Sequence, residues 1–260
     1  DFKGNAHQRN ALRRSLTQLS QNASDVDDLT SAYMGLGMLA NYENRHTEAL
    51  SFFKRSYDLA SSNVVVISNY ARALDIAGQP DLAAQKFLET FRLDPHNIGV
   101  FQSTLKISVD YLYPEILKDV TQIANGILPR EATLAILQSQ QQVEKYLNFL
   151  KNQKINLNVY RSIFQCVDTL IYSEVSTATM VKHNSFINID CDCYSDMIRV
   201  SHLTPTQISD LNDALEDRIL KWVGENKVNY PDGELKRMVS HLTFYFMPMD
   251  NVEVAHENAS

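Results

Sequence analysis

Apolar residues recur every three or four positions through most of the first 175 residues, which is the spacing of one face of an α-helix. Polar residues fill the positions between them, so each helix is expected to bury one side and expose the other. The segments with this pattern are 6–22, 31–62, 66–97, 98–126, 130–152 and 158–175. The apolar side of the first segment is predicted to pack on the helix at 31–45 and consists of Ala11, Leu12, Leu16 and Leu19.

After Lys182 the pattern changes to an alternation of apolar and polar residues, which is typical of a half-buried β-strand. In SFINIDCDCY the alternation places on one side Ile187, Ile189, Cys191 and Cys193. Further on, Thr204, Pro205 and Gln207 supply an N-cap, a first-turn proline and a capping-box partner for a helix. The elements predicted here are a strand in SFINIDCDCY, a turn at Tyr194-Ser195-Asp196, a strand at 197–203, the capped helix ending near Gly224 and a strand at 241–247.

Segments 31–62 and 66–97 match each other when one is shifted by 34 residues. The matched pairs are Gly37 with Ala71, Ala49 with Ala83, Phe53 with Phe87, Leu59 with Leu93 and Ser61 with Pro95. In both segments the first helix carries large residues followed by a small one. A turn follows, and the second helix then has an alanine four residues before a phenylalanine and ends at a helix stop. Such an internal repeat predicts that one structural unit occurs at least twice.

Each feature of the repeat has a physical cause. Gly37 and Ala71 are expected where the first helix of a unit presses its backbone against the second. On the second helix the alanine admits the neighbour, and the phenylalanine one turn later fills the gap. Gly78 suits a left-handed helix end, Pro80 suits a first helical turn, and Asp94-Pro95 disfavours further helix.

This order resembles the tetratricopeptide repeat, and the match is closest in the second unit, at Tyr70, Ala71, Ala83, Phe87 and Pro95. The first unit departs from the family's pattern at Ala40 and Ser61. Residues 98–126 are predicted to form a degenerate third unit, with Phe101 and Leu105 in register. The resemblance covers about residues 6–126 and implies an α-solenoid of stacked helix pairs.

The expected fold class is mainly α, a tetratricopeptide-like α-solenoid followed by a small α+β unit of order strand–strand–helix–strand. The expected domains are 1–126 for the repeats, 127–180 for a helical extension or cap and 181–247 for the α+β unit, with 248–260 as a disordered tail.

The resemblance implies that the first helices of the units line one concave face, and the 34-residue register predicts which side chains share it. The predicted rows are Met34, Ser68 and Gln102; Met38, Arg72 and Lys106; and Asn41, Asp75 and Val109. The residues predicted to bind a partner are Met34, Met38, Tyr42, Asn69, Arg72, Gln102 and Lys106. Methionines adapt to varied apolar surfaces, while Arg72 and Lys106 can receive an acidic side chain or a terminal carboxylate.

An alternative interpretation gives these residues no partner. In it Arg72 and Lys106 belong to a solvated helix face, and Met34 and Met38 are partly core. The family's clamp for C-terminal carboxylates is not predicted, because Met34 and Met38 stand where its lysine and asparagine would be.

Composition narrows the function classes only a little. The hydrophobic share of 44%, the net charge of −7 and the pI near 5.5 are typical of a globular protein and argue against a general binder of nucleic acid or anionic membranes. No apolar run reaches the roughly 18 residues that a bilayer span needs. Three cysteines in a chain this long do not indicate a disulfide framework, so a reducing, cytoplasmic location is expected. Because the chain begins at Asp1, it is expected to be a fragment or a processed product.

Chemistry in the α+β unit is a second alternative. Asp190 and Asp192 could hold a divalent cation if Asp196 or His202 converged on them; otherwise they form a solvated strand face. Cys191 and Cys193 could ligate zinc, or one could pair with a histidine as a nucleophile, where the candidate histidines are His183, His202 and His241. Cys166 is expected to be a small buried residue.

The N-terminal cluster RNALRR is expected to be a solvated helix face, with nucleic-acid contact as the alternative. No Gly-rich phosphate loop, metalloprotease motif or nucleophile elbow occurs.

The function expected is that of a non-enzymatic scaffold or adaptor that binds a peptide segment or partner protein in the groove and uses no cofactor. Self-association through the α+β unit is a further expectation. The alternatives are an enzyme or effector with a divalent-metal site, to which the repeats recruit a substrate, and nucleic-acid-linked regulation. Neither organism, pathway nor partner follows from the residues.

Overall fold

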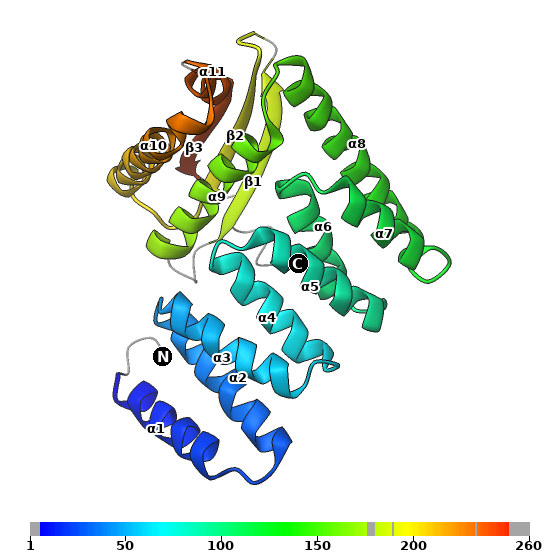
Figure 1. The fold of residues 1–260 in the computed structure, drawn as a ribbon, viewed down its shortest axis with the longest axis vertical. Coiled ribbons are helices and arrows are strands. Elements are labelled where there is room, and N and C mark those ends of the chain that lie inside the picture. The colour runs from blue at the N-terminus through cyan, green and yellow to red at the C-terminus, as the bar shows by residue number, and fades with distance from the viewer. Residues whose placement is uncertain (1–5, 176–179, 189, 232, 250–260) are drawn as a thin grey trace. The chain divides into compact units, whose positions relative to one another are not determined.

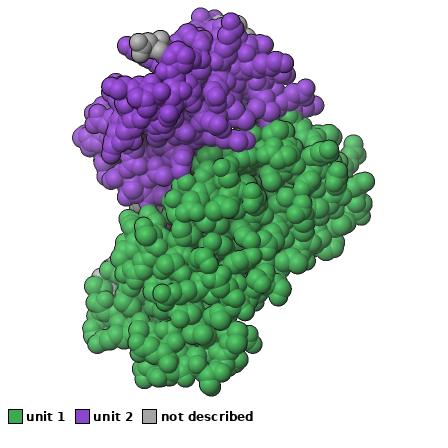
Figure 2. Space-filling model, in the orientation of Figure 1, with its two compact units in different colours: residues 1–140 green, residues 141–260 purple. Residues whose placement is uncertain are grey.

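Two compact units make up the chain, residues 1–140 and 141–260, and each is described by itself (Figure 2). The computed structural model describes residues 6–175, 180–188, 190–231 and 233–249. The domain boundaries predicted from the sequence stay predictions.

The first unit consists of consecutive helices joined by short turns (Figure 1). Their bounds are α1 (Ala6–Asn22), α2 (Val26–Tyr42), α3 (His46–Leu59), α4 (Val64–Ile76), α5 (Pro80–Leu93), α6 (Ile98–Asp110), α7 (Pro114–Ala124) and α8 (Arg130–Asn152), the last of which continues into the second unit. The prediction that α1 packs on the following helix is confirmed, because a Cβ added at Gly35 of α2 would lie 2.8 Å from Leu16.

The 34-residue period is present in the backbone as well as in the sequence. α5 repeats the bounds of α3 with this shift, and α6 repeats those of α4. The first helix of each pair is followed by a residue with left-handed backbone: Asn44 (φ 57°), Gly78 (φ 71°) and Leu112 (φ 53°). The next residue donates its N–H back to a helix carbonyl in all three turns, from Arg45 to Ala40 (2.9 Å), Gln79 to Leu74 (2.9 Å) and Tyr113 to Ser108 (2.8 Å). The prediction of a third helix pair within 98–126 is therefore confirmed.

Close packing inside each pair follows the predicted pattern. A Cβ added at Gly37 would lie 3.0 Å from the ring of Phe53, so a side chain at this position would force the ring to shift. Ala71, its counterpart, is fully buried. Phe53 belongs to a buried cluster with Ala40, Ala49 and Ala73.

Two asparagines one period apart fix the starts of α4 and α6. The side chain of Asn63 accepts a hydrogen bond from the N–H of Val65 (3.0 Å), and that of Asn97 accepts one from Val100 (3.2 Å). These side-chain oxygens satisfy N–H groups that a helix start leaves without a partner.

The second unit packs helices against a three-stranded sheet of order β1-β2-β3 (Figure 1). Besides the end of α8, its elements are α9 (Leu157–Glu174), β1 (Val181–Asn188), β2 (Cys193–Val200), α10 (Pro205–Asn226), the 3₁₀ turn η2 (Lys227–Asn229), α11 (Glu234–Ser240) and β3 (Leu242–Pro248). β1 and β2 are antiparallel, whereas β2 and β3 are parallel and joined through α10, η2 and α11. The predicted order strand–strand–helix–strand is confirmed, with α11 as an addition.

The predicted turn at Tyr194-Ser195-Asp196 is wrong, because these three residues lie inside β2 and are buried. The chain reverses earlier, where Asp192 takes a left-handed conformation (φ 49°). Both faces of β2 are covered, so polar residues such as Ser195 and Asp196 are buried there as well. The alternation of apolar and polar residues therefore does not distinguish a buried from a solvent-exposed side in this strand. Ile189 of the predicted strand lies outside the described residues.

α10 begins with the predicted capping box. The side chain of Thr204 accepts from the N–H of Gln207, and the side chain of Gln207 accepts from the N–H of Thr204 at 2.9 Å. The helix buries Ile208, Leu211 and Leu215 and ends two residues after Gly224.

Replacing Thr204 by alanine is expected to lower the free energy of unfolding by about 1 kcal/mol, because it removes the hydroxyl that accepts a hydrogen bond from the N–H of Gln207 at the start of α10. Trp222, the single tryptophan of the chain, lies in α10, so its fluorescence during urea unfolding measures the loss. Thr206→Ala, an exposed threonine two residues on, is the control and should change the midpoint little. Equal losses in the two variants would contradict the role of the cap.

One side-chain amide closes the outer edge of β3. Asn212 of α10 donates from Nδ2 to the carbonyl oxygen of Phe246 (3.0 Å), and its Oδ1 accepts from the N–H of the same residue (2.7 Å). At this residue the amide occupies both hydrogen-bonding groups that a further strand would use.

The first two residues of the tail predicted to be disordered, Pro248 and Met249, are ordered. Pro248 ends β3, and Met249 is buried, with its N–H bonded to the carbonyl of Val200 (3.0 Å). The rest of the predicted tail lies outside the described residues. None of the described helices is both long and apolar enough to cross a membrane.

Candidate functional site

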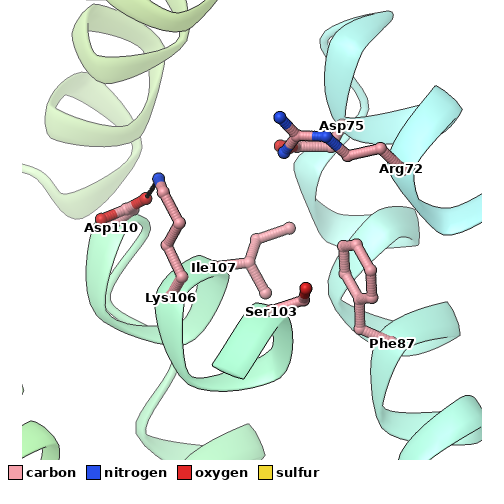
Figure 3. Close-up of a pocket in the computed structure, with 7 residues that line it drawn as sticks. All are labelled: Arg72, Asp75, Phe87, Ser103, Lys106, Ile107 and Asp110. Atoms are coloured by element: carbon pink, nitrogen blue, oxygen red, sulfur yellow. Dashed lines mark hydrogen bonds and ion pairs between the residues drawn. The ribbon is translucent and has the colours of Figure 1, made fainter. Parts of the chain in front are cut away.

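A hollow on the first unit brings together two of the residues predicted to bind a partner (Figure 3). It contains about 280 Å³ of empty space, part of it open solvent. Its lining comes from α4, α5 and α6: Arg72, Asp75, Phe87, Ser103, Lys106, Ile107 and Asp110. The 34-residue register thus places Arg72 and Lys106, from successive first helices, at one depression.

Both cations in the hollow are paired with a carboxylate on their own helix. Arg72 donates to Asp75 one turn later (2.9 Å), and Lys106 donates to Asp110. Asp75 is buried, whereas the side chains of Arg72 and Lys106 are 50% and 55% exposed. The hollow therefore offers hydrogen-bond donors and acceptors side by side and carries no net charge of its own.

The floor of the hollow is apolar. Phe87 and Ile107 are 3% and 4% exposed, so only a small part of each lies open between the two ion pairs. An apolar floor with charged walls suits a side chain with an aliphatic stem and a polar end.

The other residues predicted to bind a partner are less uniformly placed. Met34 is half-buried and packs against the Phe53 cluster, as the alternative interpretation predicts, whereas Met38 is 58% exposed. Tyr42 is half-buried, and Gln102 is exposed on α6. Asn69 is half-buried and donates to the carbonyl of Val65 (2.8 Å), which occupies one of its amide hydrogens.

Four lining residues of the hollow were not predicted from the sequence: Phe87, Ser103, Ile107 and Asp110. Phe87 was assigned to the helix contact alone, although the same ring also forms the floor. Asp110 stands four residues after Lys106, a spacing that predicts a helical ion pair. That signal was present in the sequence.

The N-terminal arginines are held in an ion-pair network. Arg13 binds Glu43 at the end of α2 and lies 3.8 Å from Glu48, while Arg45 also bonds Glu43 (2.6 Å). Burial raises the pKa of Glu43, but the bonds from Arg13 and Arg45 outweigh it and hold the pKa below its usual value. These contacts tie α1 to the α2–α3 turn, so Arg13 of RNALRR, whose side chain is 25% exposed, belongs to an ion-pair network and not to the solvated face that was expected.

In the second unit a buried carboxylate joins two residues of β1. Asp196 is fully buried; its Oδ2 lies 2.7 Å from His183 Nδ1, and its Oδ1 accepts from Ser185 (3.0 Å). This order differs from that of a catalytic triad, in which the histidine stands between the carboxylate and the serine. The three residues connect β1 to β2 across the antiparallel pair.

Buried tyrosines surround this group. Tyr194 lies edge-on to Tyr146 and Tyr160, with ring centroids 5.1 and 5.4 Å away. Burial, together with the charge of Asp196, raises the pKa of Tyr194 well above its usual value. Tyr146, whose hydroxyl donates to the carbonyl of Ser185 (2.6 Å), also has a pKa raised by burial. Both phenols therefore stay protonated at neutral pH.

The metal site considered from the sequence is not assembled. Asp190 and Asp192 are exposed in the β1–β2 turn, whereas Asp196 is buried within β2. Within the described residues, no group of three or more His, Cys, Asp or Glu side chains could hold a metal ion.

Cys191 and Cys193 are joined by a disulfide, which contradicts the expectation of reduced thiols and removes both as zinc ligands or nucleophiles in this state. Cys166 carries a half-buried thiol, and burial raises its pKa.

No family model matches the chain, and no curated protein matches it either.

Proposed function

We propose that the chain is a non-enzymatic interaction protein in which a tetratricopeptide-like solenoid holds a segment of a partner protein along the inner faces of α2, α4 and α6. The proposal depends on one observation above all: the 34-residue period brings Arg72 and Lys106 to one hollow. A repeat that places equivalent side chains of successive helices side by side suits the recognition of an elongated ligand.

The charges of the hollow indicate the kind of segment. Because each cation has a carboxylate beside it, a purely acidic peptide would meet repulsion from Asp75 and Asp110. A segment that carries both an acidic and a basic or amide side chain can bond to all four groups. Exposed Met38 would add adaptable apolar contact at the α2 end.

The test uses peptides selected from a random library against the full chain, with affinities measured by titration calorimetry. The variant is Arg72→Gln with Lys106→Gln, because glutamate at either position would put two carboxylates together and confuse binding with stability. We expect the affinity to fall at least tenfold, the effect of about 1.4 kcal/mol. Because the side chains of Asp75 and Asp110 are only 10% and 14% exposed, the variant is expected to lose some stability, so the affinity is measured well below its melting temperature.

The matched control is Lys54→Gln with Arg92→Gln. These residues also form ion pairs, with Asp58 (2.7 Å) and Asp119 (2.6 Å), whose carboxylates are more exposed than Asp75 and Asp110, and they do not line the hollow. Affinity that is unchanged in the first variant, or reduced equally in both, would contradict binding at this site.

A further inference from the structure

We propose that Cys191 and Cys193 form a thiol–disulfide exchange site that reacts with a dithiol reductant. The disulfide lies where β1 turns into β2, and its two ends differ in access. Cys191 is exposed in the turn, whereas Cys193 opens β2 and is only 6% exposed. An attacking thiolate can therefore reach the sulfur of Cys191 and not that of Cys193.

The bond contributes little as a staple of the fold. It joins residues two positions apart, and the stabilisation by a cross-link falls as the loop that it closes becomes shorter. Other contacts already hold the turn: Asp192 accepts from Gln153 through Oδ2 (2.6 Å) and from His241 Nδ1 through its carbonyl oxygen (3.0 Å). The turn is thus expected to keep its shape when the disulfide opens.

Ser195 is placed to assist the departing sulfur. Its Oγ lies 3.7 Å from the Sγ of Cys193, and because a disulfide sulfur carries no hydrogen, the serine is the donor. A hydroxyl that donates to a thiolate stabilises the charge that appears when the bond breaks. Ser195 is therefore a positioning residue for Cys193 as the leaving group.

The exchange proceeds in two balanced steps. A thiolate of the dithiol bonds to Sγ of Cys191, the Cys191–Cys193 bond breaks, and its electron pair leaves on Sγ of Cys193, which is then protonated from solvent. In the mixed disulfide, the first sulfur of the reductant is bonded to Sγ of Cys191. The second thiolate of the same reductant molecule attacks that first sulfur, closes the reductant's disulfide and releases Cys191 as a thiolate. Two electrons reach the protein, which ends with two thiols, and the dithiol ends as a disulfide.

The charges at the turn select among reductants. Asp190 and Asp192 flank Cys191 and are exposed, so they repel a thiol compound of net negative charge. The attacking thiolate of dithiothreitol carries one negative charge, whereas that of glutathione carries further carboxylates and a larger net negative charge, and salt weakens the repulsion of both. Added salt should therefore accelerate the reaction of glutathione more than that of dithiothreitol.

The experiment follows reduction of the folded full chain by dithiothreitol, quenched with an alkylating reagent and read by peptide mass spectrometry. We expect the oxidised chain to gain two alkyl groups at Cys191 and Cys193 while Trp222 fluorescence stays native. Half-buried Cys166 is the internal control and should be alkylated much later. The proposal is overturned if the two thiols stay free after treatment with oxidised glutathione, or if reduction requires denaturant.

Two pairs of variants test the assigned roles. With Cys193→Ser, the remaining Cys191 should be alkylated fast, and with Cys191→Ser the remaining Cys193 should be alkylated slowly; equal rates would overturn the assigned direction of attack. Ser195→Ala should slow reduction about fivefold, the effect of one hydrogen bond, and Ser195→Thr should restore the rate. Thr243→Ala, the exposed hydroxyl paired with Ser195 on β3, should leave it unchanged. An Ser195→Ala rate equal to the wild type would exclude the role of Ser195.

Discussion

Replacing Phe53 by alanine is expected to lower the free energy of unfolding by about 3–5 kcal/mol, the cost of removing a buried aromatic ring. The ring is 2% exposed and lies between the backbone of α2 at Gly37 and the alanines of the cluster. Gly37 has no side chain that could move into the space, so the cavity would stay open. Urea unfolding followed by far-UV circular dichroism measures the loss, because most helices belong to the first unit.

Leu93→Ala is the control for this experiment. Leu93 ends α5 and is 51% exposed, so its truncation should change the free energy of unfolding by about 0.5 kcal/mol or less. Similar losses for Phe53→Ala and Leu93→Ala would mean that the helix pairs do not pack as described.

Replacing Asp196 by alanine is expected to destabilise the second unit by about 2–4 kcal/mol. The change removes the carboxylate that the ring nitrogen of His183 and the hydroxyl of Ser185 bond, and each partly buried polar group left without its partner costs about 1–3 kcal/mol. Fluorescence of Trp222 during urea unfolding reports this unit.

Two further variants sharpen the test of Asp196. Asp196→Asn keeps the shape and two bonding atoms, so its loss should be smaller than that of alanine. Asp210→Ala removes an exposed carboxylate of α10 and should be nearly neutral. An Asp196→Ala midpoint equal to that of Asp210→Ala would show that the buried bonds contribute nothing.

The helical half of the fold could be predicted because its signals are local. Gly78 and Pro80 mark a turn within four residues, and the spacing of Ala83 and Phe87 marks the contact face of one helix. The bounds of α1 and α8 follow from periodicity alone and agree with the structure. The capping box at Thr204 is equally local and is also confirmed.

The sheet and the candidate site could be predicted only in part, because they depend on contacts between distant residues. Ser195 and Asp196 look like turn residues until β1 and the surrounding helices bury them, and the partner of Asp196, His183, is thirteen residues away. Arg72 and Lys106 were assigned to one row by the repeat. Their pairing with Asp75 and Asp110, which removes the net positive charge expected of that row, was not recognised.

The amide of Asn212 has a consequence for how copies of the chain meet. An open sheet border invites another polypeptide to continue the ladder, and this is a common route to aggregation. At Phe246 a strand from another molecule would first have to displace the two hydrogen bonds that the Asn212 amide makes. Asn212 thus hinders the addition of a strand from another copy at the β3 edge. Folded copies that associate there would have to do so through side chains.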